Sequence, residues 1–495
     1  MKIFILRLTI VIHNTVTFLK YKIKMINTKK ILIKISFMIC LIIVWTKSDM
    51  AAMTIQEEID LGKIFVSQVR SQLPLIKDQD ILTYVQYVGN RLLENVPEKH
   101  FDFSFYVIRE KTYNAFAGPG GHIFVHSGLI EAMESELELA GILAHEIAHV
   151  TCRHISERID RSKKVNMASL AGTIAGILIG GNVGMAMVYG SAAAQQSMFL
   201  AYTRENEREA DQNSLRYLRD AGYNGQGLIT ILKKIRKINW IDVSDMPTYM
   251  MTHPGLNERL VYIDTALAAN SEFNKKAKIN HSNRFKKINI RLRALYGDRS
   301  QTNLFKENIK KYPDDYLYHY AYGLRLAVSG KRQKSIIEFT KALQLRPFDA
   351  DVLRDTGIAY FYNEQYQKAI KYLLSANDIV PHDIECQFFM GRVREKLGHT
   401  HSAAELWEHL LTIKPDLNKL HYYLGNLYGK KGNTSDAHYH LGVFYEKENN
   451  IRLARFHLKK ALDITDKSSK RYKEIEKLLK SVQKQKKTMK PNSVG

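Results

Sequence analysis

The stretch GILAHEIAHVTCRH, residues 141–154, places three histidines and a glutamate in an otherwise apolar helical pattern. His145 and His149 are four residues apart, so on a helix they share one face, roughly 6 Å from each other. Two neutral imidazoles at that spacing can ligate one metal ion. Glu146 is rotated by about 100° and is predicted to act as a general base instead. Because unpaired polar groups are costly in an apolar helix, a metal site is favoured over two core histidines.

A third ligand is expected on a second helix, YTRENEREADQNSLRYL at residues 202–218. Its periodicity predicts a buried stripe of Glu207, Ala210, Asp211, Ser214 and Leu218, opposite a solvated stripe of Glu205, Glu209, Gln212 and Arg216. Glu207 would complete a site of two histidines and one glutamate with a position left free, and Asp211 would orient a ligand. The alternative is a helix exposed on all sides, with Glu207 solvated.

Cys152 and His154 are weaker candidates for the third ligand. The extended motif with a third histidine needs Gly at position 152 and His at position 155, where this chain has Cys152 and Ile155. Both residues are therefore expected to be local packing or surface residues.

The carboxyl-terminal half contains an internal repeat of 34 residues, marked by Gly323, Gly357, Gly391 and Gly425. Small residues follow twelve positions later, and large apolar residues sixteen positions later: Phe339, Leu373, Trp407 and Leu441. This is the tetratricopeptide pattern of antiparallel helix pairs. The phase slips at Gly442, which predicts a continuing stack closed by a charged helix near residues 468–485.

Before the first motif, helical periodicity over residues 54–96 gives way to alternating strand patterns. FDFSFYVI ends at residue 108, HIFVHS covers residues 122–127, and the turn AGPGG at residues 117–121 precedes the second strand. The predicted fold is an α+β zincin-like metalloprotease domain, residues 51–270, followed by an all-α tetratricopeptide-repeat solenoid, residues 271–495. Strand 122–126 is either an acceptor for an added substrate strand or an ordinary internal strand.

The amino terminus predicts export. Lys29, Lys30 and Lys34 precede ISFMICLIIVW, residues 35–45, an apolar run too short to span a bilayer. Residues 1–50 are expected to be a signal peptide, with an uncleaved anchor as the alternative. Met25 is an alternative start, which would make residues 1–24 an artefact of the assigned start. Cleavage would leave Cys152 and Cys386, which permit one disulfide.

Two further features each leave two readings open. Residues 165–194 are rich in Ala, Gly and Met and break at Gly180 and Gly181; they predict a helical hairpin that either packs internally or contacts a lipid surface. The formal net charge of +23 is either spread over a solvated surface or forms a basic face. No nucleic-acid partner is expected.

Several motifs together resemble one known family. They are HEIAH at residues 145–149, ENEREAD at 205–211, THPGLNER at 252–259 and NAFAGPGGHIFVHSGLI at 114–130. With the repeats, this combination resembles the exported, repeat-bearing branch of the zinc metallopeptidases related to the Oma1, Ste24 and HtpX proteases. The resemblance implies zinc ligands His145, His149 and Glu207, the base Glu146, and Asp211 as the supporting carboxylate.

The resemblance assigns less definite roles to His253 and Arg259. His253 would stabilise the oxyanion, swing onto zinc and hold the enzyme latent, or be structural before Pro254. Arg259 would stabilise developing negative charge or pair with a carboxylate.

The resemblance also implies a role in the periplasm, in association with the outer membrane. Such a protease would degrade misassembled outer-membrane β-barrel proteins and assist their assembly, using its repeats to bind substrate or the assembly machinery. The alternative function is a repeat-based adaptor or chaperone with a structural or latent zinc site.

Overall fold

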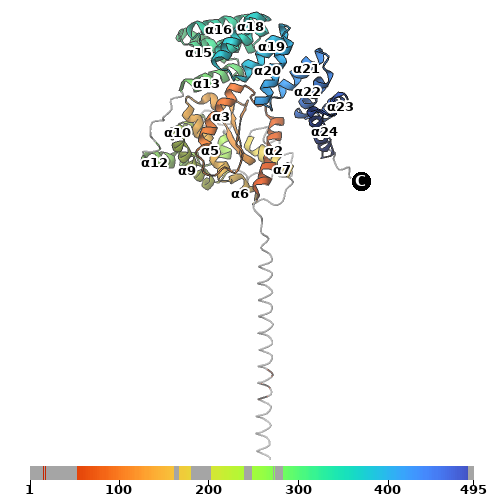
Figure 1. Cartoon of the computed structure of the whole chain (residues 1–495). Coiled ribbons are helices and arrows are strands. Elements are labelled where there is room, and N and C mark those ends of the chain that lie inside the picture. The colour runs from red at the N-terminus through yellow and green to blue at the C-terminus, as the bar shows by residue number, and fades with distance from the viewer. Residues whose placement is uncertain are drawn as a thin grey trace, which may run out of the picture.

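A computed structural model describes residues 53–160, 167–179, 202–238, 248–270 and 282–488, together with residues 15, 17, 20 and 273. The first part is a mixed domain of helices around a small sheet, and a curved stack of helices lies above it (Figure 1). The predicted α+β domain followed by an all-α repeat solenoid is confirmed. The expected signal peptide, residues 1–50, lies outside the described residues apart from positions 15, 17 and 20.

The helices of the first part surround a three-stranded sheet. They are α2 (Ile55–Gln72), α3 (Gln79–Leu93), α4 (Ser127–Ala132), α5 (Glu136–Thr151), α6 (His154–Asp160), α7 (Met167–Ile179), α9 (Arg204–Asp220), α10 (Gln226–Ile238), α11 (Thr248–Thr252) and α12 (Leu256–Ala269). The strands are β1 (Ser104–Ile108), β2 (Ala115–Gly118) and β3 (His122–His126), and a short 3-10 turn (Pro119–Gly121) joins the last two.

The strand β3 is the centre of the sheet, in the order β1-β3-β2. It pairs in parallel with β1 and antiparallel with β2, so both of its edges are occupied. The hypothesis that strand 122–126 accepts a substrate strand is therefore wrong, because no free backbone edge remains there. The sequence pattern also missed β2, whose small residues read as part of the turn. Those small residues matter, since a Cβ at Gly118 would lie 2.3 Å from the ring of Phe65 on α2.

The helix α5 is buried along almost its whole length because it packs against α3, α9, α10 and the sheet. Its approach to α10 requires glycine on both sides. A Cβ at Gly141 would lie 2.7 Å from the backbone of Leu228, and one at Gly227 would lie 2.1 Å from the carbonyl oxygen of Leu137. This close contact fixes the helix that carries the two-histidine motif.

The helix α7 represents the described part of the predicted hairpin 165–194, and it packs against α2. Its apolar face joins a core cluster with Phe65 and Val69, and the residues that α7 contributes are Leu170, Ala171, Ile174, Ala175, Leu178 and Ile179. The described half therefore fits internal packing, and residues 180–194 lie outside the described residues. No helix among the described residues is both long and apolar enough to cross a membrane.

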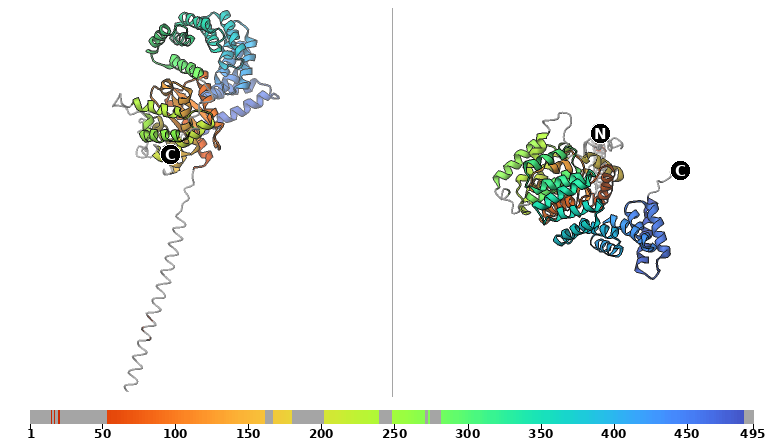
Figure 2. Two further views of the ribbon diagram at one scale, coloured as in Figure 1. Left: turned by 90° about the vertical axis from the view of Figure 1, so that its left-hand side faces the viewer. Right: turned by 90° about the horizontal axis from the view of Figure 1, so that it is seen from above.

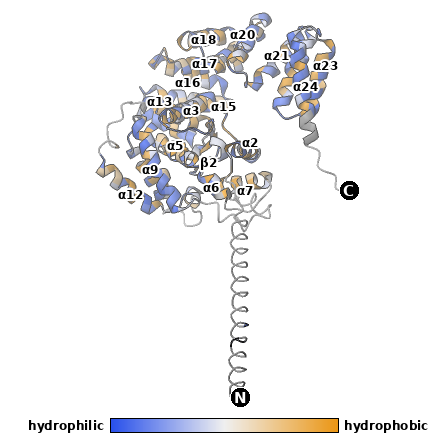
Figure 3. Ribbon diagram, turned by 60° about the horizontal axis from the view of Figure 1, so that its bottom comes forward, coloured by the Kyte–Doolittle hydropathy of each residue, from blue (hydrophilic) through white to orange (hydrophobic). Residues whose placement is uncertain are grey.

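The second part is a stack of antiparallel helices that curves into an arc, seen best in Figure 2. Its helices are α13 (Ser282–Tyr296), α14 (Gln301–Lys311), α15 (Tyr316–Val328), α16 (Arg332–Leu345), α17 (Ala350–Tyr362), α18 (Tyr366–Ile379), α19 (Ile384–Lys396), α20 (Thr400–Ile413), α21 (Asn418–Lys430), α22 (Thr434–Lys447), α23 (Ile451–Ile464) and α24 (Lys470–Thr488). Hydrophilic and hydrophobic residues alternate around these helices (Figure 3), as expected for elements that bury one face against their neighbours.

The repeat glycines lie where paired helices cross, as the sequence predicted. A Cβ at Gly323 would lie 2.6 Å from Phe339, and one at Gly391 would lie 2.1 Å from Trp407. The glycine at the phase slip behaves in the same way, since a Cβ at Gly442 would lie 2.7 Å from Leu458. Helix α22 therefore pairs with α21 on one side and with α23 on the other, and the predicted continuation of the stack is confirmed.

The helix α13 connects the two parts because it contributes to both cores. Phe285, Ile288 and Leu292 pack into the core of the first domain, whereas Ile290 and Ala294 pack into the first repeats. The side-chain amide of Asn289 donates to the carbonyl oxygen of Ile130 at 2.7 Å and to that of Met133 at 3.1 Å. One helix therefore fixes the base of the solenoid against α3 and α4.

Two buried arginines complete the junction between the parts. Arg291 of α13 pairs with Asp78 at 2.8 Å and with Asp80 at 3.1 Å, both at the start of α3, and also with Asp355 of α17. Arg354 is 1% exposed and bonds to Asp80, Asp355 and Asp383. Removing one partner of such a buried pair costs about 3–5 kcal/mol, because the remaining charge is uncompensated. The solenoid is thus held to the first domain by charge as well as by apolar contact.

The last repeats contain two pairs of facing histidines. The Nδ1 atoms of His421 and His440 lie 3.0 Å apart, and those of His438 and His457 lie 2.8 Å apart. Burial, Lys447 and Arg471 lower the pKa of His421 to about 4. In the described part of the chain, Cys152 and Cys386 are free thiols, so the disulfide that the sequence permitted is not formed.

We predict that acid selectively weakens these last repeats. The folded state keeps His421 neutral, so below pH 6.5 the unfolded chain binds more protons than the folded chain. The free energy of unfolding of these repeats should be highest above pH 6.5 and should fall progressively toward pH 4. His440, whose pKa is also lowered, acts in the same direction. Amide hydrogen exchange should show lower protection of α21–α23 at pH 5 than at pH 7. In the variant His421→Asn/His440→Asn, the protection should change less between the two pH values. Equal protection at both pH values would contradict this prediction.

Candidate metal centre

The two-histidine motif lies on the buried face of α5, where the sequence placed it. His145, Glu146 and His149 are each 0% exposed. The Nε2 atoms of His145 and His149 lie 3.0 Å apart and face the same point. The helical spacing of four residues therefore brings two potential ligand atoms together, as expected.

The helix α9 supplies the carboxylates, and its predicted stripes are confirmed. The helix begins at a capping box in which Thr203 accepts from the backbone of Asn206 and donates to its side chain. Glu207 and Asp211 are buried, at 1% and 0% exposure, whereas the predicted solvated residues Glu205, Glu209, Gln212 and Arg216 are exposed. The alternative of a helix exposed on all sides is wrong, because α9 packs along α5.

Four residues bring ligand atoms to one point: His145, His149, Glu207 and His253. Glu207 lies 3.4 Å from the Nε2 atoms of both His145 and His149. The Nδ1 atom of His253 lies 3.0 Å from Glu207 and 3.4 Å from His145 Nε2. Imidazole nitrogens and a carboxylate are donors that suit a divalent transition metal.

The hydrogen bond from His145 to Asp211 fixes which nitrogen of His145 faces this point. His145 Nδ1 lies 2.9 Å from a carboxylate oxygen of Asp211, which can only accept, so His145 donates there. Burial and Arg259 lower the pKa of His145, but Asp211 and Glu207 outweigh both and raise it to about 9. Without a metal, the cluster therefore takes up a proton. A metal cation at the same atoms would supply the positive charge instead, so the residues present fit a metal ion.

Glu146 differs from the other carboxylates of the site. Neither of its oxygens has a hydrogen-bond partner among the described residues, although the side chain is fully buried. Burial raises its pKa, opposed by His253 and His145. A buried carboxylate with unused lone pairs and a raised pKa is suited to accept a proton from a water molecule.

Arg259 of α12 pairs with the two buried carboxylates of α9. Its guanidinium donates twice to Asp211 at 2.8 Å and lies 2.6 Å from Glu207. The sequence suggested two roles for Arg259, and the structure shows one of them, pairing with carboxylates. These pairs help to hold the pKa of Glu207 well below its usual range, because His253 and Arg259 outweigh burial.

The site is closed in this structure. The ring of Tyr249 on α11 stacks on His253 with centroids 4.3 Å apart, and the ring of Tyr202 stacks on His149 at 3.7 Å. His253 and Tyr249 are 0% exposed and Tyr202 is 2% exposed. Solvent therefore does not reach Glu146 in this structure.

His154 is a packing residue, one of the two readings expected for it, because it is 1% exposed. The sequence did not reveal that its Nδ1 atom lies 2.9 Å from His149 Nδ1. The missed signal lies at the end of α5, where Arg153 adopts a left-handed φ of 53° and turns the chain back. Tyr262, which donates to Asp211, was also missed, because no sequence spacing links it to the motif.

Comparison with known proteins agrees with this geometry. The profile of peptidase family M48 matches residues 82–267, and a tetratricopeptide-repeat profile matches residues 435–468. The chain therefore carries a metallopeptidase domain of family M48, followed by tetratricopeptide repeats. The family resemblance predicted from the motifs is confirmed.

Particular relatives share this domain. Over 213 residues, the chain is 33% identical to the Beta-barrel assembly-enhancing protease of Yersinia pestis, covering 42% of this chain and 44% of the relative. The corresponding Escherichia coli protein is 30% identical, with the same coverage. Mitochondrial metalloendopeptidase OMA1 of Schizosaccharomyces pombe is 26% identical over 37% of this chain and 51% of that protein. The chain spans less than half the length of the beta-barrel assembly-enhancing proteases that it matches.

Solved structures resemble parts of this chain only distantly. The crystal structure of MamA covers 30% of this chain and 87% of its own chain, with 23% identity and a TM-score of 0.28.

We predict that metal removal destabilises the first domain. A cation that binds only the folded chain adds stability in proportion to RT ln(1 + [L]/Kd). Treatment with a chelator should lower the melting temperature, added Zn²⁺ should restore it, and His149→Ala should remove the response. Because the metal displaces the proton held by His145, binding should weaken as the pH falls. A melting temperature indifferent to zinc at every pH would contradict the metal site.

Proposed function

We propose that this chain is a zinc-dependent endopeptidase. The observation that carries the proposal is a buried carboxylate without hydrogen-bond partners, Glu146, beside a cluster of ligand atoms from His145, His149 and Glu207. With His253 displaced from the cluster, these three protein ligands would leave one position free, as in catalytic zinc sites, whereas structural zinc usually takes four. The M48 domain supports the same reaction class.

In this proposal each residue has a distinct task. His145, His149 and Glu207 hold the ion, and Asp211 orients His145 through its Nδ1 atom. A bound zinc ion would supply a Lewis acid that polarises the scissile carbonyl and acidifies a nearby water molecule. Glu146 takes a proton from the attacking water and passes it to the leaving amine. Arg259 keeps Asp211 and Glu207 ionised and in place.

His253 accounts for the closed state. Its Nδ1 atom lies among the ligand atoms, 3.0 Å from Glu207, where it is able to act as a fourth ligand. We propose that the closed enzyme is latent and that displacement of His253 with α11 opens it. The alternative function, a repeat-based adaptor or chaperone with a structural or latent zinc site, applies if His253 stays in place under all conditions.

The biological role is proposed from the relatives. Proteins named Beta-barrel assembly-enhancing protease match the peptidase domain of this chain, and like the sequence motifs they suggest outer-membrane quality control. The proposed substrates are unfolded or stalled outer-membrane β-barrel proteins, and the proposed partner is the β-barrel assembly machinery. In this proposed role the protein acts in the periplasm, to which residues 1–50 would export it as a signal peptide, and is associated with the outer membrane.

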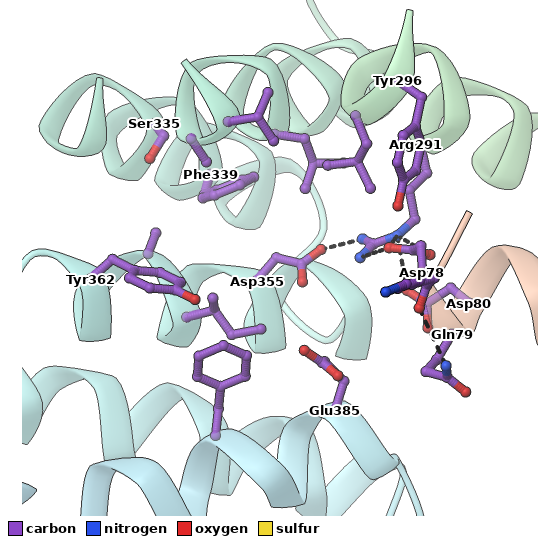
Figure 4. Close-up of a pocket in the computed structure, with 18 of the residues that line it drawn as sticks. Asp78, Gln79, Asp80, Arg291, Tyr296, Ser335, Phe339, Asp355, Tyr362 and Glu385 are labelled. Carbon is purple, nitrogen blue, oxygen red and sulfur yellow. Dashed lines mark hydrogen bonds and ion pairs between the residues drawn. The ribbon is translucent and has the colours of Figure 1, made fainter. Parts of the chain in front are cut away.

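A cavity at the junction supports a binding role for the repeats. It has a volume of about 620 Å³ and lies between the start of α3, α13 and the first repeats (Figure 4). One end is apolar, with Phe339 and Tyr362, and the other holds the Arg291 and Asp355 ion pair. Tyr362 and Val328 at its wall remain 48% and 53% exposed. Such a cavity suits an extended polypeptide segment with apolar side chains.

The decisive test of the reaction is the variant Glu146→Gln. It should reduce cleavage of an unfolded β-barrel protein by at least about 10²-fold, because the general base is lost, while zinc content stays equal to the parent. His253→Ala should cleave faster than the parent if His253 holds the enzyme latent. Activity is measured by gel-resolved product formation, with zinc quantified on the same samples.

Two outcomes would favour the adaptor. One is full zinc content without cleavage by either the parent or His253→Ala. The other is full cellular function of Glu146→Gln.

Binding by the cavity is tested separately from cleavage. In a Glu146→Gln background, Val328→Ser/Tyr362→Ser should weaken binding of an unfolded β-barrel protein by about tenfold, as expected when part of an apolar contact is lost. Phe348→Ser is the matched control, because Phe348 is 83% exposed and does not line the cavity. Equal affinities for all three proteins would exclude the cavity as the binding site.

A further inference from the structure

The second histidine of the motif is backed by another histidine and not by a carboxylate. The Nδ1 atoms of His149 and His154 lie 2.9 Å apart, with ring centroids at 5.0 Å. The opposite nitrogen of His154, Nε2, lies 3.3 Å from a carboxylate oxygen of Glu209. His154 is 1% exposed, whereas the side chain of Glu209 is 59% exposed, so the series runs from solvent to the buried ligand cluster.

The backbone around His154 is held independently of the ligand cluster. Arg153 has its left-handed φ of 53° between α5 and α6, and its guanidinium donates to Glu58 and to the carbonyl oxygen of Met53. Glu58 is buried at 2% exposure and also accepts from Ser156. Contacts on both sides of His154 therefore fix its ring against His149.

The hydrogen-bond partners determine which nitrogen carries each proton. An ionised carboxylate only accepts hydrogen bonds, so His154 donates from Nε2 to Glu209. Neutral His154 then has its lone pair on Nδ1, which can only accept from His149 Nδ1. His149 therefore keeps its own lone pair on Nε2, the atom that faces His145 and Glu207. Once a metal ion displaces its second proton, His145 likewise has its lone pair on Nε2, because its Nδ1 atom donates directly to Asp211.

We propose that His154 is a positioning residue that fixes the tautomer and the ring orientation of His149, with Glu209 setting the tautomer of His154. This inference rests on the proposed function, because it concerns how a proposed metal ligand is prepared. It also gives a role to Glu209, although this residue lies on the solvated face of α9. Mutation of the hydrogen-bond partner behind a metal-binding histidine typically weakens metal affinity by about 10–100-fold.

One competing arrangement uses the same atoms. Cys152, His154 and Glu209 are close enough to hold a metal ion of their own. That ion would bind His154 at Nε2, so a neutral His154 would carry its proton on Nδ1. This proton would face the proton that His149 carries on its own Nδ1 atom, 2.9 Å away. The two arrangements are therefore mutually exclusive, and the number of ions bound distinguishes them.

The test compares metal affinity in variants of the full chain, measured with Zn²⁺ by chelator competition. His154→Phe should weaken affinity by about 10–100-fold, since it fills the space but cannot accept from His149. His154→Asn, whose side-chain oxygen can replace Nδ1 as acceptor, should recover most of that loss. Glu209→Ala should weaken affinity by less than tenfold, and Glu205→Ala, an exposed carboxylate of the same helix, should match the parent.

A spectroscopic measurement on the parent keeps the proposal testable if a variant fails to fold. Nitrogen chemical shifts of ¹⁵N-histidine in the zinc-loaded chain should report His149 protonated at Nδ1. A lone pair at that atom would overturn the proposal. So would unchanged affinity in folded His154→Phe, or a second zinc equivalent that is lost in Cys152→Ser.

Failure of this inference is distinct from failure of the proposed function. If the parent cleaves protein while His154→Phe binds zinc normally, only the positioning role fails. If the affinities follow the expected order and neither the parent nor His253→Ala cleaves, the positioning role stands and the peptidase proposal fails.

Discussion

The first domain depends on one constraint: α5, an otherwise apolar helix, carries ionisable side chains that are buried in the core. The helix α5 lies in the core, so His145, Glu146 and His149 have no contact with solvent. Their burial is costly unless other buried groups compensate. The compensating groups come from α9 and α12, which lie far from α5 in the sequence. Apolar packing alone tolerates small shifts of a helix, but these pairs at about 3 Å do not.

Glu146 is engaged less closely than the other buried carboxylates of the site, because its contact to His253 Nε2 is 3.7 Å long. Asp211 and Glu207 are paired with Arg259, whereas both oxygens of Glu146 are without hydrogen-bond partners among the described residues. The lone pairs of Glu146 that no hydrogen bond engages fit the general-base role proposed for it. Tyr249, which stacks on His253, is as fully buried as Glu146, so the group lies out of contact with solvent in this structure.

The same principle joins the two parts of the chain. Arg291 and Arg354 are buried among aspartates from α3, α17 and the start of α19, while α13 packs into both cores. Removing one partner of these pairs would leave a buried charge uncompensated, so the arginines and their aspartates fix how the two parts fit together. The cavity at this junction lies beside those ion pairs, so a ligand bound there would contact both parts of the protein.

By itself, the sequence determined whatever depends on local periodicity. The spacing of His145 and His149, the buried stripe of α9 and the 34-residue repeat follow from helical geometry, which relates residues close in the chain. It could not reveal that β3 is central, that His154 supports His149, or that Arg291 and Arg354 join the domains. Those features depend on contacts between segments far apart in the chain or across a backbone reversal, and no periodicity encodes them. Only the tertiary structure brought α5, α9 and α12 to one point, because the energy of pairing buried charges is realised only when all three helices are in place.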